Sequence, residues 1–227
     1  MQGRDYFTII ALPALGDLGS VPPIPGRALL NRIEGNGKAY TAVEAMLLSD
    51  DLLLRDAALA GEQAKTQPSV LTADQITGDS PLPDYLTAET SAVRTIAGDA
   101  VWDIYYHHAA DIARQVGNQL LSAWVAYEVT LRNALASQRS RVLELEADQY
   151  LLAQDLACDD VGCQEVVSAW SAASGPLAAT QVIDQARWTW LDENDRWFSF
   201  ANEEIAAYAA RLMILHRWDR TAGEKDQ

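Results

Sequence analysis

The apolar residues of this chain are most regularly spaced between Asp99 and Arg141. They recur at steps of three and four, which is typical of one face of an α-helix, in a stretch with no proline and a single internal glycine, Gly117. An unbroken helix of this length would extend for roughly 60 Å. The pattern therefore predicts either one long helix bent at Gly117 or two helices that meet there, with Asp99 as a candidate N-cap. The apolar stripe consists of Val101, Tyr105, His108, Ile112, Val116, Leu120, Trp124, Tyr127, Leu131 and Leu135.

The first third of the chain has a more interrupted pattern. Residues 5–12 are rich in β-branched and aromatic side chains, so we expect an extended segment there. Prolines and glycines over 13–25 predict a loop. A short helix is expected over 27–34, and the Gly-Asn-Gly sequence at 35–37 would end it. Its inward-facing residues would be Leu29, Leu30 and Ile33.

Residues 39–60 carry two groups of apolar residues separated by polar ones, which predicts two short helices, the second capped by Ser49 or Asp50. Glycines and prolines interrupt residues 61–87, so we expect a linker or a mobile loop there. Within it, the sequence from Thr72 to Gln75 resembles a capping box that opens one turn of helix.

Charge is distributed unevenly after the long central stretch. Between Val142 and Ala186 there is no Lys or Arg, but there are eight acidic residues. They could form a solvated helix face together with a loop at 159–162, or an acidic docking surface for a basic partner. The sequence leaves both interpretations open. The acidic residues are Glu144, Glu146, Asp148, Asp155, Asp159, Asp160, Glu165 and Asp184.

The helical pattern resumes at about 163–173. A second helix is expected to begin at Pro176, because proline is well tolerated at the first helical position, and to end near Asn194. A last helix is predicted over 200–218, followed by a frayed polar tail at 221–227. The aromatic residues of this region are expected to lie in the core rather than at an interface; they are Trp188, Trp190 and Trp197.

These patterns together predict an all-α fold, an elongated helical domain with long central helices. Residues 1–98 would form a helical and loop region and residues 99–227 a long-helix region of one continuous domain. Of the 227 residues, 49% are hydrophobic, which is enough to build a core. No run reaches the ~18 apolar residues that a membrane span requires, and the first residues do not resemble a signal peptide. We therefore expect a cytoplasmic protein.

Composition also narrows the choice of partners. The net charge of −15 disfavours nucleic acid, whose phosphates select an excess of Lys and Arg, and favours a basic protein partner. The two cysteines, Cys158 and Cys163, are too few for a Cys₄ zinc site and do not form a CxxC motif. We expect both to be reduced thiols.

One group of residues could bind a metal ion. Asp103, His107 and Asp111 are spaced i, i+4, i+8, so all three fall on one helix face, where one nitrogen and two carboxylates could hold a divalent metal. The alternative is an exposed or interhelical polar stripe. We favour the stripe, because the Glu-x-x-His signature of di-metal bundles is absent at all three histidines.

A second polar cluster lies within the long apolar stretch. Glu128 and Arg132 are four residues apart and are expected to pair, with Asn133 beside them. The cluster could be an internal interhelical network or part of a binding surface. Phosphate-binding G-x-x-x-x-G-K-[ST], nucleophile-elbow G-x-S-x-G and dinucleotide G-x-G-x-x-G motifs are all absent. We therefore expect no ATP hydrolysis by this chain, no cofactor and no catalytic residues.

Three segments resemble a known family. The opening YFTIIALPAL followed by PPIP, the central WVAYEVTLRNALASQRSR and the late EEIAAYAARLMILHRW are similar to short bacterial proteins of the V/A-type ATPase C/d-like family. The central pattern is carried by Tyr127, Leu131, Arg132, Asn133 and Leu135. The late pattern is carried by Tyr208, Arg211, Leu212, Ile214, Leu215, Arg217 and Trp218.

The resemblance implies a mechanical role. The C/d-type protein of these rotary ATPases is an all-helical funnel that sits on the cytoplasmic face of the rotor ring and receives the central stalk. The chain would then be a non-catalytic coupling subunit in ATP-linked proton or sodium transport, held at the inner face of the membrane through protein partners. Because it is about a third shorter than the full-length C/d-type proteins, it would lack one helical unit. Candidate partner contacts are Glu128, Arg132, Asn133, Tyr208 and Arg211.

Two other functions are compatible with the residues. One is a helical assembly factor or regulator that binds the same rotary complex transiently. The other is a metal-dependent helical-bundle enzyme that uses the Asp103, His107 and Asp111 group. Co-purification with the rotary complex at stoichiometric levels would distinguish a permanent subunit from a transient assembly factor. Metal analysis of the pure protein would test the enzyme hypothesis.

Overall fold

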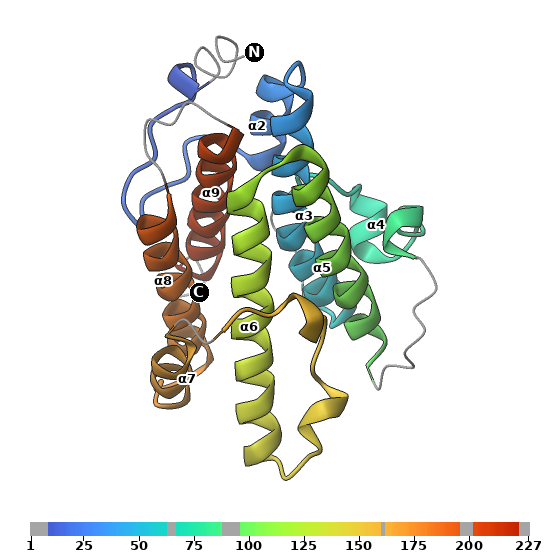
Figure 1. Cartoon of the computed structure of the whole chain (residues 1–227), viewed down its shortest axis with the longest axis vertical. Helices are drawn as coiled ribbons and strands as arrows, with labels where there is room; N and C mark the ends of the chain where they lie inside the picture. The colour runs from blue at the N-terminus through green and yellow to red at the C-terminus, as the bar shows by residue number, and fades with distance from the viewer. Residues whose placement is uncertain (1–8, 63–66, 88–95, 160–161, 196–201, 223–227) are drawn as a thin grey trace.

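Every regular element in the part of the chain that the structure describes is a helix, as Figure 1 shows. This computed structural model describes residues 9–62, 67–87, 96–159, 162–195 and 202–222. Five helices are long: α3 (Gly37–Leu59), α5 (Ala97–Val116), α6 (Gln119–Val142), α8 (Pro176–Asn194) and α9 (Asn202–Ala222). The shorter elements are α2 (Gly26–Ile33), α4 (Ala73–Thr77), η1 (Asp84–Leu86), η2 (Ala147–Gln149), η3 (Gln154–Leu156) and α7 (Cys163–Ser171).

The predicted long central stretch consists of two helices, α5 and α6, which pack against each other as a hairpin (Figure 1). Gly117 ends α5 with a φ of 71°, a left-handed conformation that glycine adopts without steric cost. Asn118 then caps α6, because its side-chain oxygen accepts the N–H of Leu121 at 2.8 Å. Asp99 is not the N-cap that we expected: α5 begins two residues earlier, and this carboxylate instead pairs with Arg132.

The most enclosed helix is α9, which packs against α2, α3, α6 and α8. Its side chains are buried on every face between Ile205 and Leu215, except for the partly buried Tyr208. A helix that is apolar on all sides is stable only when other helices surround it. The bundle is therefore organised around α9, while α6 lies at its surface and extends beyond the other long helices at the lower end of Figure 1.

The prediction of two short helices over 39–60 is wrong, because α3 is a single helix of 23 residues. Ser49 and Asp50 do not interrupt it, since both are satisfied without a break in the backbone ladder. The Ser49 hydroxyl donates to the carbonyl of Met46 at 2.9 Å, and Asp50 pairs with Arg217 of α9. The helix packs against both α5 and α9. The division proposed between residues 98 and 99 falls inside α5, because that helix begins at Ala97.

The described part of the expected linker, residues 67–87, is packed on α3 rather than mobile. Leu71 and Ile76 are buried, and α4 opens with the capping box that the sequence predicts at Thr72 and Gln75. Asp51 of α3 fixes the segment in place. Its carboxylate accepts backbone N–H groups from three successive residues at 2.6–2.8 Å: Ser69, Val70 and Leu71.

Three other predictions from the sequence are confirmed. The helix with Leu29, Leu30 and Ile33 buried is present as α2, Pro176 occupies the first position of α8, and both cysteines are free thiols. Half of the predicted extended segment at 5–12 lies outside the described residues, and in the other half Ile9 and Ile10 are helical, so the prediction is wrong there. Trp197 and most of the tail at 221–227 also lie outside them. Within the described ranges, no helix has both the length and the apolar composition needed to cross a bilayer.

The Asp51 contacts generate a stability prediction. Replacing Asp51 with Ala removes the acceptor for three backbone N–H groups, so the free energy of unfolding should fall by about 3 kcal/mol in urea titrations. Asp79→Ala is the matched control, since Asp79 is exposed and accepts only the Thr77 hydroxyl, and it should cost less than about 0.5 kcal/mol. Equal losses in the two variants would contradict this account of the segment.

Candidate functional site

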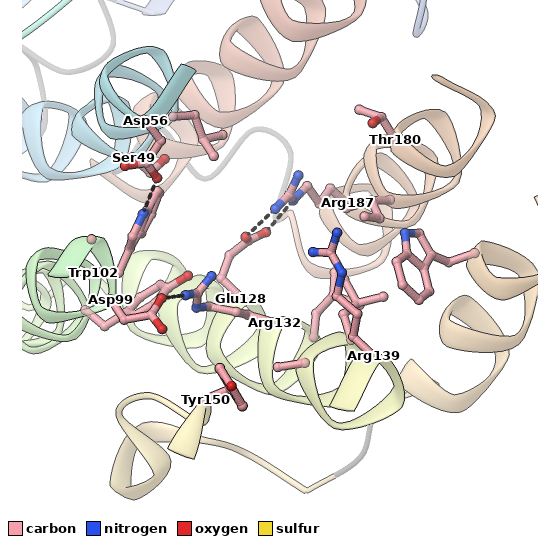
Figure 2. Close-up of a pocket in the computed structure, with 18 of the residues that line it drawn as sticks. Ser49, Asp56, Asp99, Trp102, Glu128, Arg132, Arg139, Tyr150, Thr180 and Arg187 are labelled. Atoms are coloured by element: carbon pink, nitrogen blue, oxygen red, sulfur yellow. Dashed lines mark hydrogen bonds and ion pairs between the residues drawn. The ribbon is translucent and has the colours of Figure 1, made fainter. Parts of the chain in front are cut away.

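A cavity of about 940 Å³ lies over the C-terminal half of α6 and is ringed by residues of α3, α5, α8 and α9 (Figure 2). Five of its lining residues are arginines, although the chain has a net charge of −15. The cavity therefore gathers a large share of the positive charge of an acidic protein. The five are Arg132, Arg139, Arg187, Arg217 and Arg220. We call this space the α6 cavity.

One wall is an ion-pair network between α6 and α8. Arg187 donates through Nε and one terminal nitrogen to the two carboxylate oxygens of Glu128, each at 2.7 Å, and through the other to Asp184 at 3.1 Å. Burial alone would lower the pKa of Arg187, but Glu128 and then Asp184 outweigh it and raise the pKa. All three nitrogens of this guanidinium therefore have acceptors. The second oxygen of Asp184 is buried and has no hydrogen-bond donor among the described residues.

The opposite wall comes from α3 and α5. Arg132 donates to Asp99 at 2.5 Å, and its guanidinium lies 5.9 Å from the ring centre of Trp102. The indole N–H of Trp102 donates to Asp56 of α3 at 2.8 Å, and burial raises the pKa of this carboxyl. The Nε of Arg132 is buried and, within the described ranges, has no acceptor. This donor is therefore shielded from the cavity and is unsatisfied within the described part of the chain.

A third ionic group closes the cavity where α3 meets α9. Arg217 and Arg220 both donate to Asp50, at distances of 2.7–3.0 Å. Burial would raise the pKa of Asp50, but the two guanidinium groups outweigh burial and lower it. This carboxylate therefore stays ionised and holds the end of α9 on α3.

Aromatic side chains provide much of the apolar lining. Tyr105 and Tyr106 pack around Trp102 with ring centres 5.4–5.8 Å apart. Burial raises the pKa of both phenols, so they stay neutral, and the hydroxyl of Tyr105 donates to the carbonyl of Ala45 at 3.1 Å. Trp124 makes an edge contact with Trp190 at 5.5 Å. The core position that we expected for Trp190 is confirmed.

The residues proposed from the sequence as partner contacts are all engaged within the chain. The expected pair between Glu128 and Arg132 is wrong, because Glu128 binds Arg187 and Arg132 binds Asp99. Both side chains project from α6, Glu128 toward Arg187 of α8 and Arg132 toward Asp99 of α5 (Figure 2). Their partners lie 59 and 33 residues away, so no local spacing could reveal them.

The other three candidates lie away from this cavity. The side-chain amide nitrogen of Asn133 donates to the carbonyl of Leu152 at 2.8 Å, and the side-chain oxygen accepts the N–H of Leu152 at 3.0 Å. The hydroxyl of Tyr208 donates to the carbonyl of Pro13 at 2.8 Å, and burial raises the pKa of this phenol to about 12. Arg211 is buried and pairs with Asp192 and Asp195, which lie at the end of α8.

The residues weighed as a metal-binding group, for which a polar stripe was the favoured interpretation, do not converge on one point. Asp103 accepts the backbone N–H of Ala153 at 2.8 Å, Asp111 pairs with Arg114, and His107 binds Asp155. Among the described residues, no three His, Cys, Asp or Glu side chains are grouped as metal ligands. The structure therefore places these residues in three separate polar contacts.

Two of these contacts belong to a segment, residues 150–158, that crosses α5 and α6. Asn133 and Asp103 hold its backbone, and the hydroxyl of Thr130 accepts the N–H of Cys158 at 3.0 Å. His107 adds a titratable contact, with one ring nitrogen 2.8 Å from the carbonyl of Asp103 and the other 3.1 Å from Asp155. Since both neighbours are acceptors, only the protonated ring satisfies both.

Sequence reasoning missed the cavity and most of its polar lining. Arg139, Asp184 and Arg187 were not recognised as members of one site, because they come from two helices whose relative position no local pattern encodes. One signal was present in the sequence: Arg139 lies two turns after Arg132, so both are on the same helix face. Comparison of the chain with known protein families, with curated proteins and with solved structures gives no significant match.

The network on the α8 wall predicts a stability effect. Glu128→Gln removes the charge that compensates the buried Arg187, so the free energy of unfolding should decrease by about 3 kcal/mol in a denaturant titration. Asp111→Asn breaks an exposed pair with Arg114 and should cost less than about 1 kcal/mol. If the first variant were as stable as the second, Arg187 would not depend on Glu128.

The contacts of His107 predict a pH effect. Burial lowers its pKa, but the carbonyl of Asp103 and the Asp155 carboxylate outweigh burial and raise it above the ordinary value of 6.5. Stabilisation is then complete below pH 6.5 and is lost as pH rises through the folded-state pKa. The difference in melting temperature between wild type and His107→Gln should therefore be largest just below pH 6.5 and shrink as the pH rises through the raised folded-state pKa.

His108→Gln is the control for this measurement. Burial lowers the pKa of His108, so its protonation below pH 6.5 opposes folding, and the substitution should change the pH profile in the opposite sense. A His107→Gln variant whose melting temperature differs from wild type by the same amount at every pH would refute the ionic contact with Asp155.

Proposed function

We propose that this chain is a non-catalytic coupling subunit, of the C/d type, in a rotary V/A-type ATPase. It would join the central stalk to the membrane rotor ring at the cytoplasmic face, in ATP-linked proton or sodium transport, through protein contacts alone. The choice of this complex rests on the resemblance of the opening, central and late segments to the C/d-like family. The all-helical body and the features below support a role in protein–protein coupling.

The observation that carries this proposal is the projecting end of α6. Val142, Leu143 and Leu145 are 71%, 59% and 47% exposed, and they are interleaved with the exposed acidic residues Glu144 and Glu146. Three large apolar side chains in one exposed group favour a contact with another protein, because water solvates them poorly. We call residues 142–146 the α6 tip. Its acidic residues favour a basic partner surface.

Resistance to bending also supports a coupling role. Buried or partly buried ion pairs join α3 to α9 through Asp50, α6 to α8 through Arg187, α5 to α6 through Arg132, and α8 to α9 through Arg211. Breaking one partner of such a pair leaves an uncompensated charge, so each pair opposes sliding of one helix past another. A protein that transmits torque needs this property more than it needs a catalytic centre.

The proposal is tested by purification of the intact complex. A tagged chain expressed in its native cell should co-purify with the catalytic and stalk subunits of the rotary ATPase from detergent-solubilised membranes, at one copy per central stalk. Absence of those subunits, or ATP hydrolysis by the pure chain, would overturn the proposal. Recovery at far below one copy would instead identify a transient assembly factor.

Val142→Asp tests the role of the α6 tip. The added charge should reduce recovery of the ATPase subunits several-fold, because it places a carboxylate in the proposed contact. Val21→Asp is the matched control, since Val21 is 79% exposed but lies far along the chain from the tip, and it should leave recovery unchanged. Equal recovery with both variants would place the contact elsewhere on the molecule.

A further inference from the structure

We propose that the α6 cavity binds a monoanionic amphiphile, a molecule with one carboxylate and an acyl chain. The carboxylate would pair with Arg139, and the chain would lie along the aromatic and aliphatic lining. This inference does not depend on the rotary ATPase assignment. It rests on Arg139, which lines the cavity and has no ion-pair partner among the described residues, on the volume of the cavity and on the composition of its walls.

Arg139 provides the site for the head group. Its side chain points from α6 into the same space as that of Arg187 (Figure 2). Arg187 has carboxylate acceptors for all its nitrogens, and Arg132, Arg217 and Arg220 each have at least one carboxylate partner. Arg139 has no ion-pair partner among the described residues, so it can bind an external carboxylate through two parallel hydrogen bonds.

Two polar atoms beside the cavity have no partner within the described residues. The Nε of Arg132 is a buried donor without an acceptor, and one oxygen of Asp184 is a buried acceptor without a donor, as far as the described residues go. Buried polar atoms are rarely left unsatisfied, so each such atom calls for an explanation. Both atoms have less than 1 Å² of accessible surface, so neither faces the cavity, and Arg139 remains the group that a ligand can reach.

The apolar lining fits an acyl chain. Aromatic and aliphatic side chains from α5, α6, α7 and α8 line the cavity, and its volume of about 940 Å³ lies within the range of pockets that enclose small organic ligands. Tryptophans occur on three of these helices, so a bound chain would contact indole rings. The apolar side chains that would contact a bound chain are Trp102, Trp124, Leu131, Leu135, Trp170 and Ile183.

The charges of the walls select a single negative charge. Glu128, Asp99 and Asp184 all line the cavity, and their neighbouring arginines are already used to neutralise them. A phosphate dianion would face these carboxylates with only Arg139 to compensate its charge, which disfavours it. A neutral ligand would make no ion pair with Arg139 and would gain nothing from the charge of this side chain. A monocarboxylate satisfies both constraints.

The experiment uses the full chain and cis-parinaric acid, a fluorescent long-chain carboxylate. Energy transfer from the three lining tryptophans should give a saturable signal at one molecule per chain, and dodecanoate should displace the probe. The methyl ester of the probe and dodecyl phosphate should bind at least about tenfold more weakly, because neither presents a single carboxylate to Arg139. A non-saturable signal, or equal binding of acid and ester, would overturn the proposal.

Variants locate the site. Arg139→Gln should weaken probe binding by about tenfold, whereas Arg141→Gln should not change it, because Arg141 is on the same helix but outside the cavity. Ala136→Trp should abolish binding by filling the space, and circular dichroism would confirm that this variant is folded. Since Arg139 is exposed and makes no ion pair within the described residues, its variant should fold normally. Unchanged affinity in Arg139→Gln would refute the proposal even if Ala136→Trp failed to fold.

Discussion

The bundle depends on the burial of charged groups on its most enclosed helix. α9 is apolar on nearly every face, yet it carries Arg211 and Arg217, both less than 10% exposed. A guanidinium in such an environment is tolerated only when a carboxylate and further hydrogen bonds compensate it. Asp50 of α3 and Asp195 at the end of α8 meet this requirement. The rotation of α3 about its axis and the end point of α8 are therefore set by two arginines of a third helix.

The same requirement shapes the α6 cavity. Protein interiors are normally packed to crystal density, and an apolar space of this size would tend to close. Here the ion pairs Glu128–Arg187 and Asp99–Arg132 connect α6 to α8 and to α5, and all four side chains line the cavity. Closing the space would require these paired charges to move, which opposes collapse.

Local signals in the sequence predicted the parts of the fold that local chemistry determines. Gly117 marked the turn between α5 and α6, Thr72 and Gln75 formed the expected capping box, and Pro176 opened α8. Each of these depends on residues within four positions of one another. Ser49 and Asp50 were wrongly predicted to cap a helix, because short polar residues often do so. Here Asp50 instead pairs with Arg217, which lies 167 residues away.

The candidate site could be predicted only in fragments for the same physical reason. Spacing identified Glu128 and Arg132 as a polar group on α6, but the identity of their partners depends on how α5 and α8 lie against it. His107 was assigned a possible metal-binding role because its neighbours in sequence are acidic, while its carboxylate partner, Asp155, lies in a segment 48 residues later. The one sequence signal for Arg139 is its position two turns after Arg132, which is weak because an arginine on a helix surface is ordinary until its surroundings are known.

The pairing of Asp50 with Arg217 has a consequence during protein synthesis. On a ribosome, α3 emerges more than 160 residues before Arg217, which neutralises Asp50. The apolar faces of α3 and the Asp50 carboxylate therefore stay exposed to solvent while the intervening helices form. α9 must then pack last, between helices that come earlier in the chain. Such late insertion of a central element makes folding a highly non-local event, and it makes the incomplete chain a natural client for chaperones.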